Sequence, residues 1–267
     1  MGLYRQALVV ASYNIGVVLK KILYDLYAFA SDFIRNLLLV ITYLVKGQLI
    51  VPEFIKYSNT FITNAIMPLS VIAIALGVVL AVQLGGEFNS RGMINQLGIL
   101  AAITLTRELI PIVGSFMIAT QFGTGFAAQL ANMKITQQID ALKVFEVDPI
   151  SYLVVPRFVS VALFAPLILW LACIISVISC YLTVWFKFDS NIHGFLSTIL
   201  DYFKVGDILL CFLKASIFGG IIILTSATVG LATVGGAKEV GKSATKSVIL
   251  SFIFIIIVDY IITSIYL

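Results

Sequence analysis

Long uncharged runs separated by short polar segments dominate the hydrophobic pattern of this chain. One run extends from Tyr57 to Gly86, and a second, from Gly92 to Lys134, is interrupted by charge only at Arg107 and Glu108. Apolar stretches of about 18 or more residues are long enough to cross a bilayer as a helix. The pattern therefore predicts membrane-spanning helices at 61–84, 98–122, 158–185, 208–231 and 248–267.

The first 56 residues differ, because charged side chains recur there among aromatic and aliphatic ones. This mixture is typical of helices that lie in the membrane interface, and the apolar stretch 33–45 is too short to span comfortably. We expect one domain, 1–267, in which residues 1–56 form an N-terminal interfacial region and residues 57–267 the transmembrane region. The predicted fold class is an all-α integral membrane protein with an interfacial amphipathic helix and five transmembrane helices.

Composition and charge agree with this fold. The chain is 61% hydrophobic and 11% charged, whereas soluble domains carry about 25% charged residues. The net charge of +4 comes from basic residues scattered between the spans, which excludes a nucleic-acid-binding stripe. By the positive-inside rule, the N-terminus and the loops 129–157 and 235–247 face the cytoplasm, or the stroma in a plastid. Five spans then place the C-terminus outside.

Four charged residues fall inside the predicted spans: Arg107 and Glu108 in the second, Lys214 in the fourth and Asp259 in the fifth. Each costs about 2.5–3.5 kcal/mol at a helix centre unless it finds a partner. At 1.5 Å per residue, all four lie about 10–14 Å below the outer ends of their spans. We therefore predict one compensated cluster, with two positive and two negative charges, that lines a cavity or gate. A packing network and a proton relay are the alternatives.

The polar segment 132–149 predicts a short amphipathic helix between the second and third spans. Thr136 is placed to cap it, and apolar residues recur from Ile139 at i, i+3 and i+6. Asp148-Pro149 is expected to stop the helix. An exposed helix of this kind suits a partner's groove; the alternative is that it lies flat on lipid.

The segment GAKEVGKS (236–243) matches the spacing of a phosphate-binding loop. Such a loop follows a β-strand, whereas here a membrane span precedes it, so we expect a compact glycine turn and no ATP site. The cysteines lack metal-ligand spacing, and the spans contain no Ser/His, Cys/His or HExxH arrangement. We therefore predict no catalytic site, no metal site and no cofactor in this chain.

Three segments carry a resemblance to a known family: RELIP (107–111), TQQIDALKVFEVDPISYLVVPR (136–157) and GLATVGGAKEVGKSATKSV (230–248). They resemble the MlaE/YrbE-type permeases, the membrane subunits of ABC transporters that work with Mce-domain lipid-binding proteins. The resemblance extends from about residue 31 to the C-terminus. The charges of the predicted cluster match charges in the outer part of the cavity of these permeases.

The resemblance implies a permease that moves phospholipid or another hydrophobic lipid between the membrane and an Mce-domain partner on the outer face. It implies a dimer with a second permease protomer and two cytoplasmic ATPase subunits, which bind ATP and Mg and engage a coupling helix at about 134–146. The coupling residues would be Lys134, Thr136, Gln138, Ile139, Asp140, Leu142, Lys143 and Phe145. We expect Leu76, Val79, Leu80 and Gln83 to line the cavity. The expected location is the bacterial inner membrane or the plastid inner envelope.

Several positions depart from the family pattern. Ile110 replaces a glycine, Gln121 an arginine, Gln129 a glutamate and Ala131 a glycine. The joint loss of an arginine and a glutamate indicates that these two residues form a pair in relatives, because the loss of one alone would leave an unpaired charge. Thr120, Gln121 and Gln129 resemble the YrbE branch of Mce operons, whose transporters are linked to sterols and fatty acids. The lipid class therefore stays open among glycerophospholipid, sterol and fatty acid.

Two other functions remain open from the residues alone. A proton-coupled secondary transporter would use Glu108 and Asp259 as its proton carriers. A membrane scaffold without transport activity would need the buried charges only for packing. The first would transport with a pH gradient alone, and the second would tolerate neutral substitutions in the cluster without loss of lipid homeostasis.

Overall fold

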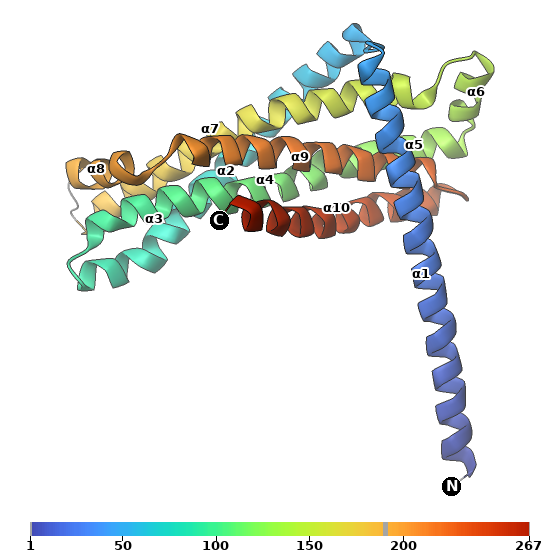
Figure 1. Cartoon of the computed structure of the whole chain (residues 1–267), viewed down its shortest axis with the longest axis horizontal. Coiled ribbons are helices and arrows are strands. Elements are labelled where there is room, and N and C mark those ends of the chain that lie inside the picture. The colour runs from blue at the N-terminus through green and yellow to red at the C-terminus, as the bar shows by residue number, and fades with distance from the viewer. Residues whose placement is uncertain (1, 189–191, 267) are drawn as a thin grey trace.

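The computed structural model describes residues 2–188 and 192–266, and every regular element within these ranges is a helix or helical turn (Figure 1). The prediction of an all-α membrane protein is confirmed, since several segments are long and apolar enough to cross a membrane. These segments are Leu26–Val45, Val51–Ser90, Leu97–Ile135, Ile150–Phe188, Val205–Leu231 and Ala237–Tyr266. The last five contain the five predicted spans, apart from residue 267, which lies outside the described residues.

Short turns join several helices into longer ones. η1 is a 3₁₀ turn, and η2, η3 and η4 are π-helical turns, so that Leu97–Ile135 and Ile150–Phe188 each run without a break. The elements are α1 (Gly2–Val45), α2 (Val51–Ser90), η1 (Ile94–Gln96), α3 (Leu97–Thr104), η2 (Leu105–Leu109), α4 (Ile110–Ile118), η3 (Ala119–Gly123), α5 (Thr124–Ile135), α6 (Gln138–Val144), η4 (Ile150–Val154), α7 (Val155–Phe188), α8 (Ile192–Tyr202), α9 (Val205–Leu231) and α10 (Ala237–Tyr266).

The long helices form a bundle in which α2 packs along α7, and α9 packs against α7, α5 and α10. Small residues allow the closest approach: a Cβ added to Gly77 of α2 would overlap the carbonyl oxygen of Ser176 on α7. The hydroxyl of Ser179 also donates to the Ile74 carbonyl at 3.2 Å. Lipid tails are as apolar as the helices, so close packing and interhelical hydrogen bonds stabilise such a contact.

α1 runs across the other helices rather than along them (Figure 1). It contacts both α10 and α9: Phe33 stacks on Phe254 of α10, and Asn36 donates to the hydroxyl of Thr228 of α9 at 3.0 Å. The apolar segment Leu26–Val45 is long enough to span a membrane, so the length argument made from residues 33–45 is wrong. The crosswise direction is nevertheless the one expected of an interfacial helix beside spanning ones.

The predicted helix between the second and third spans is present as α6, but it is shorter than 134–146. Thr136 does not cap it, because its hydroxyl donates back to the Asn132 carbonyl at 2.8 Å, and Gln137 stands at the N-cap with φ 61°. The helix also stops before Asp148-Pro149. Asp148 Oδ1 instead accepts the backbone N–H of Ile150 at 2.7 Å and so caps the next turn.

Two predicted loops are largely helical. α10 begins at Ala237, so the expected loop 235–247 is confined to the turn at 232–236, where Gly235 has φ 128°. Gly241 and Lys242 therefore lie inside a helix, which is not the geometry of a phosphate-binding loop. The connection between the third and fourth spans contains α8, anchored by the buried ring of Phe195. α6 and α8 lie at opposite ends of the bundle (Figure 1).

Candidate functional site

Lys214 of α9 is fully buried at the centre of a group of polar side chains. Its Nζ donates to Glu108 Oε2 at 2.8 Å, to the Arg107 carbonyl oxygen at 2.9 Å and to Thr263 Oγ1 at 2.7 Å. A lysine ammonium has three protons, so these bonds use its whole donor capacity. Asp259 Oδ1 lies 2.7 Å from Nζ, so the ammonium is also in direct ionic contact with this carboxylate.

Arg107 turns away from this group and pairs with Asp207. Its Nε donates to Asp207 Oδ1 at 2.7 Å, and the Tyr266 hydroxyl donates to the same oxygen at 3.2 Å. Asp207 is fully buried, and its other oxygen accepts the backbone N–H of Lys204 at the start of α9. The residues Arg107, Glu108, Asp207, Lys214 and Asp259 form what we call the Lys214 cluster.

The structure thus brings together Glu108, Lys214 and Asp259 from three helices, as the depth calculation predicts. The expected balance of two positive and two negative charges is wrong, because Asp207 adds a third carboxylate. Asp207 directly precedes the predicted fourth span, 208–231, so it is not among the charges expected inside the spans. Its spacing of seven residues from Lys214 was the available signal, since residues i and i+7 share one face of a helix.

A proline explains one of the bonds made by Lys214. Pro111 has no N–H, so it cannot donate to the carbonyl of Arg107 four residues earlier. A carbonyl left without a partner inside a membrane costs several kcal/mol. The Lys214 ammonium fills this position, which links the RELIP segment directly to the fourth span.

The same arrangement recurs at two further prolines, each inside a long helix. In both cases a side chain from another helix donates to the carbonyl that lies four residues before the proline. The pairs are Gln121 Nε2 to the Asn64 carbonyl at 3.3 Å, before Pro68, and Ser216 Oγ to the Ala162 carbonyl at 2.9 Å, before Pro166. Polar residues in these spans therefore also serve the backbone of neighbouring helices.

A second buried cation, Arg157, lies near the start of α7. Its Nη2 donates to the Tyr57 hydroxyl and to Gln129 Oε1, both at 2.8 Å. Its Cζ lies 4.1 Å from the ring centroid of Tyr57 and 4.2 Å from that of Phe126, within the range of a cation–π contact. Gln121 and Gln129 both line the pocket of about 230 Å³ beside Arg157, which we call the Arg157 pocket.

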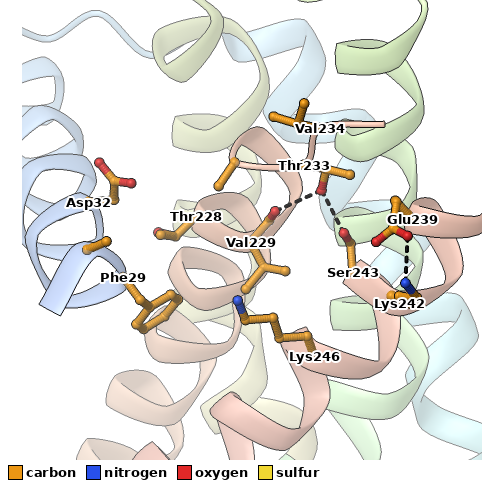
Figure 2. A pocket seen from close by; sticks show the side chains of 12 residues that line it. Phe29, Asp32, Thr228, Val229, Thr233, Val234, Glu239, Lys242, Ser243 and Lys246 are labelled. Carbon is orange, nitrogen blue, oxygen red and sulfur yellow. Dashed lines mark hydrogen bonds and ion pairs between the residues drawn. The ribbon is translucent and has the colours of Figure 1, made fainter. Parts of the chain in front are cut away.

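A larger pocket of about 490 Å³ lies between α1, the end of α9 and the start of α10 (Figure 2). Lys242 pairs with Glu239 at 2.6 Å, and the hydroxyl groups of Thr233 and Ser243 share a hydrogen bond of 2.6 Å. Lys242 and Ser243 of the GAKEVGKS segment are thus paired with nearby side chains of the chain itself. Lys246 of α10 also lines this pocket (Figure 2).

The residues expected to line the cavity occupy different faces of α2. Leu80 is buried in the protomer and Leu76 is half-buried, whereas Val79 is 49% exposed and Gln83 is exposed. Val79 and Gln83 are therefore available to a cavity shared with a second protomer, and Leu80 packs against the core of this one. Their part in a lipid cavity stays a prediction.

Comparison with known proteins places the chain among membrane transport subunits. The family described as "Permease MlaE" matches residues 54–265. A probable ABC transporter permease protein of Rickettsia prowazekii is 35% identical over 190 residues, which cover 71% of this chain and 73% of that protein. A protein of Synechocystis with the same description is 34% identical over 69% of this chain and 70% of its own length.

A plant protein is also similar. The Arabidopsis thaliana protein TRIGALACTOSYLDIACYLGLYCEROL 1, chloroplastic, is 31% identical over 71% of this chain and 54% of its own length. The family match over residues 54–265 includes the spans that carry the Lys214 cluster and the Arg157 pocket. The chain is a multi-pass membrane protein, and it belongs to the MlaE permease family.

Proposed function

We propose that the chain is the permease half of an ATP-driven ABC transporter for lipids. Two protomers would enclose a lipid cavity, two cytoplasmic ATPase subunits would bind ATP and Mg and supply the energy, and an Mce-domain protein would exchange lipid at the outer face. Family membership supports a transport subunit. The plant relative is named after a glycolipid, trigalactosyldiacylglycerol, which supports a lipid as the transported substrate.

The observation that carries this proposal is the form of α6. Val144 and Phe145 are 80% and 77% exposed at its end, although both are large and apolar. Exposed apolar side chains on a short helix between two long ones are suited to a groove on a partner. We assign this groove to the ATPase subunit.

α6 is also tied firmly to the helices that it would move. Ile139 is buried, and Lys134 of α5 pairs with Asp140 at 3.0 Å. The segment after α6 is held by a hydrogen bond of 2.8 Å from the Tyr43 hydroxyl of α1 to Asp148. A push on α6 would therefore reach both the long second span and the crosswise helix α1.

Val144→Asp tests the assignment, because it places a charge on the proposed docking face. The transporter is purified with its ATPase subunit, and the bound ATPase is measured together with ATP-dependent lipid transfer in vesicles. We expect loss of both. Val234→Asp is the matched control, since Val234 is 84% exposed in the turn before α10. Retention of ATPase by Val144→Asp, with transfer intact, would overturn the proposal.

The proton-coupled alternative rests on Glu108 and Asp259 inside the membrane. Both carboxylates contact Lys214, an arrangement that favours a fixed ion-pair network over a mobile proton. Vesicles that hold the permease and a pH gradient, without ATP, separate the two mechanisms. A scaffold without transport activity predicts that Glu108→Gln disturbs assembly and leaves lipid transfer per assembled complex unchanged.

A further inference from the structure

Among the residues that the structure describes, no acidic side chain contacts the buried Arg157. Its exposed fraction is 8%, and its two partners, Tyr57 and Gln129, are neutral. Within the described residues Nη1 has no hydrogen-bond partner. Glu53 acts on this guanidinium only from a distance and is itself 3.9 Å from Lys56. A buried charge of this kind is costly unless an opposite charge reaches it.

The cavity beside Arg157 has the size of a headgroup. Its volume is about 230 Å³, below the roughly 300–1,000 Å³ of sites that enclose a whole small ligand. Two glutamine side chains, Gln121 and Gln129, stand at its exposed edge. The inner wall is apolar and is formed by Phe61, Phe126 and Val161 among others. Such a pocket accommodates one small oxyanion with a few methylene groups behind it.

The depth of the pocket favours a lipid. Tyr57 lies six residues inside the span that starts at Val51, and Arg157 lies seven residues inside the span that starts at Ile150. At 1.5 Å per residue, the two residues are about 9 and 10.5 Å from the ends of their helices. This end carries α6 and faces the cytoplasm by the positive-inside rule. The headgroup and the first methylene groups of a lipid in the inner leaflet lie at such a depth.

We propose that the Arg157 pocket binds the oxyanion of an anionic lipid, a phosphate or carboxylate, through the guanidinium of Arg157 and the amide groups of Gln121 and Gln129. The inference rests on the proposed function, because it takes the occupant to be a transported lipid. It adds that the transporter selects lipids by a negative charge at the cytoplasmic end of the bundle. Charge-assisted hydrogen bonds from a desolvated guanidinium supply this selection.

Binding is tested on the purified transporter complex in detergent without nucleotide. Dioleoyl phosphatidate and the neutral dioleoylglycerol, which have the same tails, are offered separately, and the bound lipid is counted by native mass spectrometry. We expect phosphatidate to bind at least about tenfold more tightly, as befits one hydrogen bond to a charged group. Equal binding of the two lipids would overturn the proposal.

Gln129→Glu is the deciding variant. It replaces the side-chain NH2 group by oxygen. Arg157 then has an internal carboxylate where Gln129 Oε1 already lies at 2.8 Å from Nη2. We expect phosphatidate binding to fall by about tenfold or more, because the cation is then compensated. Gln96→Glu, an equal change on an exposed turn outside the pocket, leaves binding unchanged. If the Gln129→Glu variant is folded and its phosphatidate binding is unchanged, the site is refuted.

Inorganic phosphate separates a lipid from a free anion. Millimolar phosphate that displaces phosphatidate completely would show a site for free anions and would contradict the lipid assignment. The binding test and the transport test can give different results, since lipid binding needs neither ATP nor the contact with the ATPase. A complex that binds phosphatidate through Arg157 but does not transport it would contradict the proposed transport function and still support the binding site.

Discussion

Lys214 and Arg157 are both buried cations in the same bundle, but their surroundings differ. Lys214 gives three hydrogen bonds and touches two carboxylates. Arg157 has two neutral partners, and its buried Nη1 has no hydrogen-bond partner among the described residues. Ile223, which lines the Arg157 pocket, is nine residues from Lys214 on α9, or about 13 Å along the helix. One region is saturated by the protein's own groups, and the other leaves charge available to a ligand.

The difference separates two uses of charge in a membrane protein. A cluster in which each cation is paired with a carboxylate holds helices in register and leaves no unpaired cation for a ligand. An uncompensated cation beside a pocket selects a ligand of the opposite sign. Four substitutions test whether the two cations differ in this way.

Lys214→Met has the largest expected effect. It leaves Glu108 and Asp259 without their shared cation and removes the donor to the Arg107 carbonyl. We expect a loss of about 3–5 kcal/mol, the range for a broken buried ion pair. Thermal unfolding in detergent measures it. A combination with Glu108→Gln should recover part of the loss, and a variant as stable as the wild type would contradict the view of a compensated cluster.

Arg107→Gln comes second. Asp207 is fully buried, but the side chain of Arg107 is 22% exposed, and Asp207 keeps bonds from Tyr266 and the Lys204 N–H. The loss should therefore be smaller than for Lys214, about 1–3 kcal/mol. The same unfolding experiment measures it. A loss greater than that of Lys214→Met would show that Arg107, and not Lys214, is the centre of the cluster.

Gln129→Glu should act in the opposite direction. In the absence of lipid, a carboxylate next to Arg157 replaces a neutral bond with a charged one, which should raise stability by about 1 kcal/mol. Unfolding of delipidated protein measures the gain, with Gln96→Glu as the control. Destabilisation by Gln129→Glu, with no such effect in the control, would mean that Arg157 already has its counter-charge.

Ser216→Ala has the smallest expected effect and isolates the carbonyl contribution. It removes one neutral hydrogen bond, to the Ala162 carbonyl before Pro166. Single hydrogen bonds of this kind in membrane proteins average about 0.6 kcal/mol. The difference from Lys214→Met then measures how much of the lysine's effect comes from charge. A loss as large as that of Lys214→Met would show that Lys214 stabilises the protein mainly through its bond to the Arg107 carbonyl and not through its ion pairs.

The spans and the meeting of three charged helices were predictable from the sequence, because hydropathy depends on composition and depth depends on a fixed rise per residue. The segments that resemble the permease family also identified the family from the sequence alone. Helix ends were predicted less well: Thr136 was expected to cap a helix and does not, and a loop was expected where α10 already continues from Ala237. Local signals compete at such ends, and packing selects among them.

The partner of each buried group was decided only by tertiary structure. Asp207 joins Arg107 because α9 places it opposite η2 across the bundle, a contact 100 residues apart in the chain. The packing of the helices also places donors next to the carbonyls that lie four residues before Pro68, Pro111 and Pro166. Sequence showed which groups were costly to bury in a membrane. The packing of the helices determined that Lys214 is compensated and that Arg157 is not.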